Sequence, residues 1–231
     1  MTIAFNADRL PEMQSEYVAW VDVMGTQVSM SRSIKATANF IFKLHIAAMK
    51  AQSIAVRIYP VMDGFYVSAT DRNKMLGFLR SVFRTVAEEF NSTSKIQHRF
   101  MIRGGLAFGP VIHGGTVLEC AKELKDHKPY SESILLGMPM VQAHLSEREA
   151  PPFGIFVHES ARTFSPKDVE PLHWIWWRWS EDAPETLQIW NKLKEELITH
   201  LDDCRARSQA MLYAEDRIAV HKKMVEQYFQ A

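Results

Sequence analysis

Residues 56–69, VRIYPVMDGFYVSA, contain the pattern on which the fold assignment depends. Two runs of β-branched and aromatic residues flank Met62, Asp63 and Gly64, and an Asp-Gly pair between such runs is typical of a tight β-hairpin. The turn therefore carries a carboxylate between apolar strands. Two interpretations stay open. Asp63 forms the turn, or it binds a ligand beside a glycine that lets another group approach.

A second carboxylate lies near the end of the preceding apolar run. Residues 16–25, EYVAWVDVMG, predict a short buried strand that is interrupted by Asp22 and closed by a glycine. If this strand neighbours the hairpin, Asp22 and Asp63 meet at one end of the sheet, where only a cation or a shared proton makes the pair tolerable. Oxygen ligands alone favour Mg²⁺ or Mn²⁺. The alternative for Asp22 is an N-cap of the following helix.

The remaining patterns predict an α+β fold. Helical spacing predicts helices over residues 26–52 and over residues 72–90, the latter with Asp71 as N-cap. A further helix is predicted in residues 134–149, after the Gly and Pro of that segment. The tail is predicted to form two helices joined near Arg207-Ser208. Strands are expected at 98–118 as a pair with a tight turn near Gly109-Pro110, at 152–160 and at 172–179, and a polar excursion at 117–133. This order predicts a mostly antiparallel sheet with helices on one face, close to the ferredoxin-like arrangement, over residues 1–183, with 184–231 as a C-terminal helical extension of the same domain.

Composition excludes several classes of protein. The 231 residues carry 27 Lys and Arg against 27 Asp and Glu, which argues against a protein that grips nucleic-acid backbone. Two cysteines suggest neither a disulfide framework nor a CxxC metal site. No P-loop or GxSxG motif occurs. With no signal peptide and no run of about 18 apolar residues, we expect a cytoplasmic protein without direct membrane insertion.

Three segments together resemble the class III nucleotidyl cyclases. VAWVDVMGTQVS (18–29) is similar to the first metal motif of that family, YPVMDGFYVSA (59–69) to its second metal hairpin, and RGGLAFGPVIHGG (103–115) to the strands that follow. They occur in the family's order. The short chain, with its VQAHLSE segment (141–147), is most similar to the bacterial pyrimidine cyclases of Pycsar antiphage systems. The resemblance implies the ferredoxin-like catalytic fold of class III cyclases.

The resemblance also implies site residues. It assigns two divalent cations, Mn²⁺ or Mg²⁺, to Asp22, Asp63 and the carbonyl of Val23. It assigns triphosphate binding to the amides of three successive residues, Met24, Gly25 and Thr26. The implied reaction is that of a phosphorus–oxygen lyase, in which the ribose 3′-hydroxyl attacks the α-phosphate and pyrophosphate leaves.

The substrate expectation depends on Tyr59. In the family, the residue four positions before the second metal aspartate helps select the base, as Lys for adenine or Glu for guanine. A tyrosine can stack on or hydrogen-bond a smaller ring, so a pyrimidine nucleoside triphosphate is expected, UTP ahead of CTP. The alternative is an ordinary strand residue. The other base-selecting position falls near Ile134, which leaves Glu132 and Ser133 as weaker candidates.

The chain departs from the family at the next motif. Val141 and Leu145 stand where the family has an Asn and an Arg that assist the transition state, with Gln142 and His144 nearby. Arg103 is the candidate catalytic and substrate-binding residue that compensates by contacting phosphate. Its alternative interpretation is a strand-edge charge paired with a surface acid.

The resemblance implies partners as well. It implies a homodimer with its sites at the subunit interface, and a cyclic nucleotide second messenger that activates a separate effector protein in antiphage defence. Two alternatives stay open: a catalytically dead cyclase-like module that binds a nucleotide or a partner, and a purine (adenylate or guanylate) cyclase. The four tryptophans at 174, 176, 177 and 179 favour core packing against the C-terminal helices, with a protein interface as the alternative.

Overall fold

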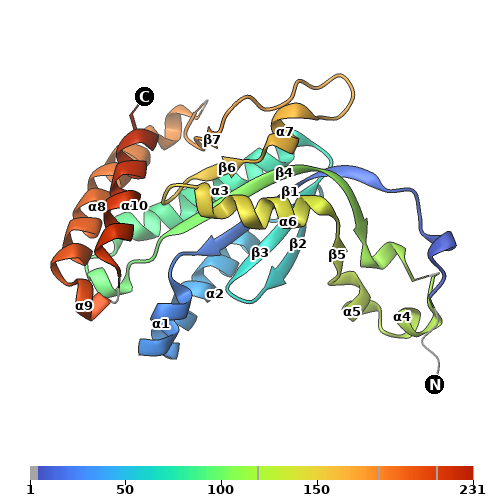
Figure 1. The fold of residues 1–231 in the computed structure, drawn as a ribbon, viewed down its shortest axis with the longest axis horizontal. Helices are drawn as coiled ribbons and strands as arrows, with labels where there is room; N and C mark the ends of the chain where they lie inside the picture. Colours follow the sequence, from blue (N-terminus) through green and yellow to red (C-terminus); the bar gives the residue numbers. More distant parts are fainter. Residues whose placement is uncertain (1–4, 119, 182, 212, 231) are drawn as a thin grey trace.

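The sheet is built around strand β1 (Gln14–Val23), the apolar run that ends near Asp22. The computed structural model describes residues 5–118, 120–181, 183–211 and 213–230 (Figure 1). Strand β1 pairs antiparallel with β3 (Gly64–Ala69) and β4 (Ile102–His113), and β2 (Arg57–Val61) pairs with the outer side of β3. The resulting order β2-β3-β1-β4 is that of the ferredoxin-like arrangement, so the predicted α+β fold with a mostly antiparallel sheet is confirmed.

Short strands extend this sheet beyond β4. Strand β6 (Ile155–Val157) pairs parallel with β4, β7 (Trp176–Trp177) pairs antiparallel with β6, and β5 (Leu135–Leu136) pairs with the far end of β4. The strands expected at 152–160 and 172–179 are therefore present but shorter. The short helices are α4 (Lys122–Asp126), α5 (Lys128–Glu132) and α7 (Glu159–Thr163), with 3₁₀ turns at Ala7–Arg9, Ile96–His98, Gly114–Thr116, Glu147–Glu149 and Pro184–Thr186.

The predicted hairpin is formed by β2 and β3. Met62 and Asp63 make the turn between the closing pair Val61 and Gly64, and Met62 has a positive φ of 50°. A Cβ on Gly64 would lie 2.3 Å from the carbonyl oxygen of Val21. Glycine is thus needed here because β1 approaches closely, which brings the end of β1 against the tip of the hairpin.

Helices α2 (Ile34–Ala51) and α3 (Arg72–Ser92) cover one face of the sheet, after the short helix α1 (Thr26–Arg32). They pack on the side chains that β1 sends to this face, which are Tyr17, Ala19, Val21 and Val23. Asp71 caps α3 as predicted, because its Oδ1 accepts a hydrogen bond from the Lys74 amide at 2.9 Å.

Helix α6 (Met138–Ser146) crosses the opposite face of the sheet, in front of β1 and β4 in Figure 1. Its Ala143 packs with Trp20 and Ala107. A Cβ on Gly105 would lie 2.0 Å from the Ala143 carbonyl oxygen, so only glycine allows this approach. The prediction of helices on one face holds for α2 and α3 and needs correction for α6.

Strand β4 corrects a second expectation, because residues 102–113 form one strand with no turn at Gly109-Pro110. The Phe108 amide donates to Ser160 Oγ at 3.1 Å, away from β1. The nitrogen of Pro110, two residues further on, faces the same side. Its missing N–H therefore removes no hydrogen bond to β1, and proline is tolerated in the strand.

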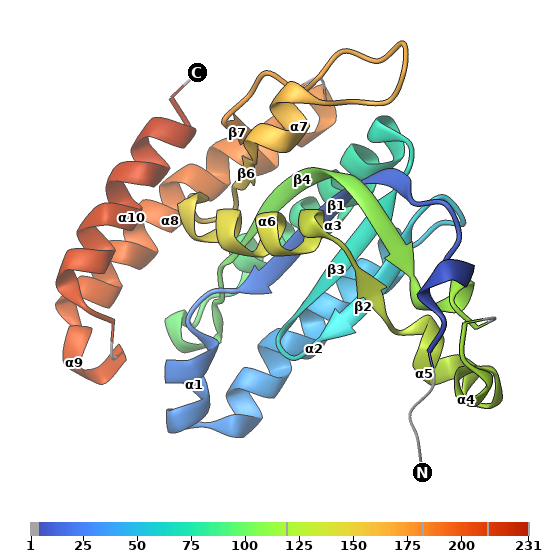
Figure 2. The same ribbon diagram turned by 45° about the vertical axis from the view of Figure 1, so that its right-hand side comes forward.

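The tail forms α8 (Leu187–Ala206), α9 (Ser208–Met211) and α10 (Glu215–Tyr228), and Figures 1 and 2 show α8 and α10 side by side beyond β6 and β7. Both helices share the core of the sheet. Trp177 and Trp179 are buried and the Trp179 and Trp190 rings lie 5.1 Å apart, which confirms core packing for these tryptophans. Within the described residues, no helix combines the length and apolar character that crossing a membrane requires.

Candidate active site

Asp22 and Asp63 meet at the end of the sheet where β1 stops. Asp22 lies opposite Gly64 in the β1–β3 ladder, so Asp63 is its diagonal neighbour. Burial raises the pKa of Asp22 to about 7 from its usual 3.8, and the negative charges of Asp63 and Glu147 add to this rise. A hydrogen bond from the Val23 amide and the charge of Arg103 act in the opposite direction. The predicted convergence of the two carboxylates is therefore found.

The two carboxylates fit a divalent cation. Asp22 Oδ1 is buried and has no hydrogen-bond partner among the described residues, whereas Asp63 Oδ2 accepts a hydrogen bond from Thr26 Oγ1. An unpartnered buried carboxylate oxygen beside a second carboxylate is costly without a positive charge. Over the described ranges, no three His, Cys, Asp or Glu side chains gather around one point. Further ligands would be a carbonyl such as that of Val23, water or phosphate, the mixture typical of Mg²⁺.

The alternatives to a metal role differ between the two aspartates. Gly25 is the N-cap residue of α1, and α1 has no side-chain cap, so the prediction that Asp22 caps this helix is wrong. Asp63 does occupy the hairpin turn, so the turn-forming interpretation holds for it. The turn and a ligand role are compatible, because the backbone makes the turn while the carboxylate points toward Thr26.

The loop between β1 and α1, with the first residue of α1, contains the three residues whose amides are assigned to triphosphate binding. Gly25 has a φ of 74°, a left-handed conformation in which a side chain is strained. The Met24 amide, in contrast, donates to the Met101 carbonyl at 2.8 Å and extends the β1–β4 ladder. The assignment of the Met24 amide to phosphate is contradicted, because a backbone acceptor already uses it. Gly25 and Thr26 remain at the start of α1, next to Asp63.

Arg103 lies directly opposite Asp22 in the β1–β4 ladder. Its Nε donates to Glu147 Oε1, and its Nη1 donates to the Arg148 carbonyl at 3.3 Å. The predicted pairing with an acid is present, but the acid is buried, because Glu147 is only 4% exposed. Arg103 is therefore held rigidly beside the carboxylate pair, and it lines the cavity described below.

Tyr59 is buried on the α6 side of the sheet, away from that cavity. Its hydroxyl lies 2.5 Å from His113 Nδ1, and His113 Nε2 lies 2.8 Å from Glu16 Oε1. The pKa of Glu16 is lowered overall. Burial alone raises it, but the hydrogen bond with His113 and smaller favourable interactions outweigh burial. The sequence reasoning missed this buried polar chain. Its only local signal is a charged residue at the start of an apolar strand.

The weaker candidates lie outside the cavity. Glu132 and Ser133 are exposed at the end of α5. Val141 and Leu145 are 50% and 57% exposed on the outer side of α6, so the positions of the family's Asn and Arg carry outward apolar side chains. His144 packs against Trp20 with ring centroids 5.3 Å apart. Helix α6 thus presents apolar, outward side chains at the two positions where the family has an amide and a guanidinium.

A cavity of about 1080 Å³ opens at the end of the sheet, lined by Val23 and Thr26, which neighbour the two carboxylates, but not by Asp22 or Asp63 themselves. One wall is the loop that connects β1 to α1, including Gly25 and Thr26, and another is the segment 96–101 before β4. Helix α10 closes the remaining side, and Figure 2 shows α9 and α10 next to the end of β1 and the start of α1. Its size suits a nucleotide-sized ligand.

No protein-family model matches the sequence, and no curated protein is significantly similar to it. The structure is similar to solved adenylate and guanylate cyclase domains. For the monomeric guanylyl cyclase domain of the RhoGC fusion protein from the aquatic fungus Blastocladiella emersonii, the TM-score is 0.49 with 21% identity, over 66% of this chain and 85% of that chain. For the guanylate cyclase domain of RhGC from Catenaria anguillulae in complex with GTP, it is 0.48 with 16% identity, over 65% and 81%. For the adenylate/guanylate cyclase/hydrolase from Silicibacter pomeroyi, it is 0.45 with 14% identity, over 64% and 76%.

Proposed function

We propose that this chain is a nucleotidyl cyclase whose Asp22 and Asp63 hold two divalent cations, Mn²⁺ or Mg²⁺. The observation that carries the proposal is the buried, unpartnered Oδ1 of Asp22 beside a second carboxylate at the end of a ferredoxin-like sheet. The order of the three sequence motifs supports the same reaction class. The products are a 3′,5′-cyclic monophosphate and pyrophosphate.

The chain's own residues have distinct roles in this proposal. The Thr26 hydroxyl orients Asp63, and the amides of Gly25 and Thr26 bind the phosphates. Arg103, fixed by Glu147, places its charge next to the reacting phosphate. Bound cations supply activation of the 3′-hydroxyl and neutralise the developing charge. The O3′–Pα bond forms as the bond between Pα and the oxygen bridging to Pβ breaks, so that pyrophosphate leaves with that oxygen and the 3′-hydroxyl proton passes to water.

The proposed substrate is a pyrimidine nucleoside triphosphate, UTP ahead of CTP. Tyr59 offers neither the ammonium nor the carboxylate that the family uses for purines. In the neutral tautomer of His113 that donates from Nε2 to Glu16, Nδ1 accepts from the Tyr59 hydroxyl. The Tyr59 oxygen then keeps lone pairs for an N–H donor on a base that approaches from the α6 side of the sheet, where the proposed homodimer would place the partner, and not from the cavity beside the carboxylates. Purine use is the alternative.

We also propose a homodimer with composite sites. The outer side of α6 and the end of β5 expose an apolar stripe at 50–63% exposure, made of Leu136, Met138, Val141 and Leu145. Such a stripe suits burial against a second copy. The antiphage role and the separate effector protein rest on the sequence resemblance alone, and the cytoplasmic location rests on the sequence patterns given above.

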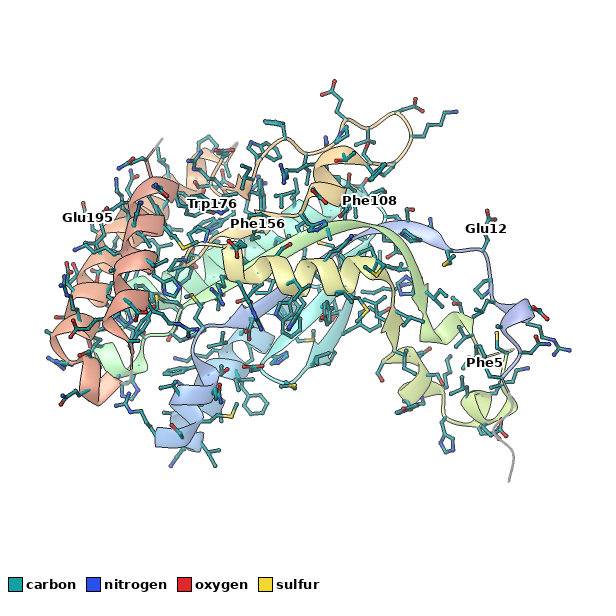
Figure 3. The ribbon with its side chains drawn as sticks, viewed as in Figure 1. Phe5, Glu12, Phe108, Phe156, Trp176 and Glu195 are labelled. Atoms are coloured by element: carbon teal, nitrogen blue, oxygen red, sulfur yellow. The ribbon has the colours of Figure 1, made fainter. Side chains whose placement is uncertain are left out.

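The test is incubation of the purified protein with each of the four nucleoside triphosphates and Mn²⁺, with products identified by mass. We expect one cyclic pyrimidine nucleotide, lost in Asp22→Ala and in Asp63→Ala. Glu12→Ala is the matched control, because Glu12 lies far from these carboxylates on the N-terminal side of β1 (Figure 3). A cyclic purine product would overturn the role of Tyr59. Nucleotide binding without any product would favour the catalytically dead module, which the outward Val141 and Leu145 also fit.

A further inference from the structure

Helix α10 of the C-terminal extension forms a wall of the cavity that adjoins the carboxylate pair. Arg217 and His221 of α10, and Tyr213 just before the helix, line the cavity together with Gly25 and Thr26. The Tyr213 hydroxyl and His221 Nδ1 are hydrogen-bonded, which fixes the inner side of the helix. A segment more than a hundred residues from the metal motifs in sequence is thus built into the same site.

Arginines outnumber carboxylates in the described lining of the cavity. Five arginines line it, which are Arg32, Arg99, Arg103, Arg148 and Arg217, whereas Asp216 is the single carboxylate among its described lining residues. Two of these arginines are neutralised by ion pairs, Arg99 with Glu196 at 2.7 Å and Arg103 with Glu147. For the guanidinium groups of Arg148 and Arg217, the described part of the chain provides no ion pair within 4.0 Å. Such a cavity attracts a polyanion.

The charges of Arg103 and Arg217 both act on the His221 side chain, so the two guanidinium groups lie near each other. Burial lowers the pKa of His221 to about 4, and the charges of Arg103 and Arg217 add to this effect. His221 is therefore neutral at pH 7, and the arginines alone supply positive charge for an anion on this side of the cavity. The two guanidinium groups line the same cavity from β4 and from α10. Glu147 already neutralises Arg103, so a polyphosphate in the cavity would pair above all with Arg217.

We propose that Arg217, with Arg148, binds the polyphosphate of the nucleotide. The inference rests on the proposed function and deepens it, because α6 provides an apolar Leu145 where the family has its arginine. The cation would instead come from α10 of the same chain. A guanidinium binds two phosphate oxygens at once, so Arg217 would hold the leaving pyrophosphate while the loop at Gly25 holds the other side.

The experiment measures binding of inorganic tripolyphosphate to the metal-free protein by calorimetry, together with the KM of the preferred triphosphate. Arg217→Gln is the variant and Lys223→Gln the matched control, because Lys223 is exposed on the same helix but does not line the cavity. We expect the Kd for tripolyphosphate and the KM to rise by about tenfold or more in Arg217→Gln, and less than about twofold in Lys223→Gln. Arg217→Lys should recover only part of the loss.

The outcomes separate this inference from the proposed function. Absence of tripolyphosphate binding by the native protein, or equal binding by Arg217→Gln and Lys223→Gln, overturns the inference. Normal cyclic product and unchanged KM in Arg217→Gln overturn it while the cyclase function stands. Loss of tripolyphosphate binding in Arg217→Gln, in a protein that makes no cyclic product, supports the anion site and removes the function. Circular dichroism verifies that each variant is folded.

Discussion

Replacing Asp22 with asparagine is expected to stabilise the metal-free protein at neutral and alkaline pH. The pKa of Asp22 is about 7 in the folded protein, against 3.8 ordinarily, because of burial first and then the charges of Asp63 and Glu147. The unfolded chain therefore releases this proton before the folded chain does. The contribution of the protonated Asp22 to the free energy of unfolding is therefore complete below about pH 4, and it is lost as the pH rises toward 7.

The magnitude follows from the difference of about 3 between the two pKa values. Each pKa unit corresponds to about 1.4 kcal/mol, which sets an upper value of about 4 kcal/mol. Solvent contact on the open side of the site reduces this, so we expect about 2 to 4 kcal/mol at pH 8. Asparagine has the same size, and Asp22 Oδ1 has no hydrogen bond to lose. The melting temperature should rise by roughly 5 to 10 °C.

The assay is guanidinium unfolding with a chelator at pH 4, 6 and 8, for the native protein, Asp22→Asn and the control Glu12→Gln. The difference between native protein and Asp22→Asn should be near zero at pH 4 and largest at pH 8. Added Mn²⁺ should stabilise the native protein and leave Asp22→Asn almost unchanged, since binding to the folded state adds stability. Equal or lower stability of Asp22→Asn at pH 8, or the same Mn²⁺ effect in both proteins, would refute the reasoning.

Two further predictions concern packing and acid sensitivity. Gly105→Ala should destabilise the protein by about 2 to 3 kcal/mol, because its Cβ would meet the Ala143 carbonyl. Gly77→Ala, at an exposed position of α3 where a Cβ has nothing within 4 Å, should stabilise the protein by up to about 1 kcal/mol. Similar effects of the two substitutions in denaturant unfolding would contradict the packing of α6 on β4. Burial, with the charge of Arg99, lowers the pKa of His200 to about 4, so its contribution to stability is present above about pH 6.5 and is lost as the pH falls toward 4. In His200→Gln, the loss of unfolding free energy between about pH 6.5 and pH 4 should be smaller by about 2 to 3 kcal/mol, as measured by denaturant unfolding. An unchanged dependence of stability on pH would count against a neutral buried His200.

Local patterns were sufficient for the elements that make the centre of the sheet. The apolar run that ends near Asp22, the Asp-Gly turn and the helical stripe after Asp71 each depend on neighbours within a few residues, and all three are present. Their adjacency follows from the ferredoxin-like strand order, so the meeting of Asp22 and Asp63 was also predictable.

Two errors in the predicted fold have the same origin. Gly109 and Pro110 resemble a turn locally, but the pairing of β4 with β1 along its whole length keeps them extended. Helix α6 was placed with the other helices, although Gly105 admits it on the opposite face. In both cases a partner distant in sequence decides between conformations that the local residues allow equally.

The sequence alone determined the strand–helix order and the two carboxylates, because periodicity and turn chemistry are properties of short segments. Only the tertiary structure showed that Tyr59 is tied to His113 and Glu16, and that Arg217 reaches the cavity beside the carboxylates. Those contacts join residues up to about two hundred positions apart. They arise from how α10 and the sheet pack together, and packing of this kind leaves no periodic signal in the chain.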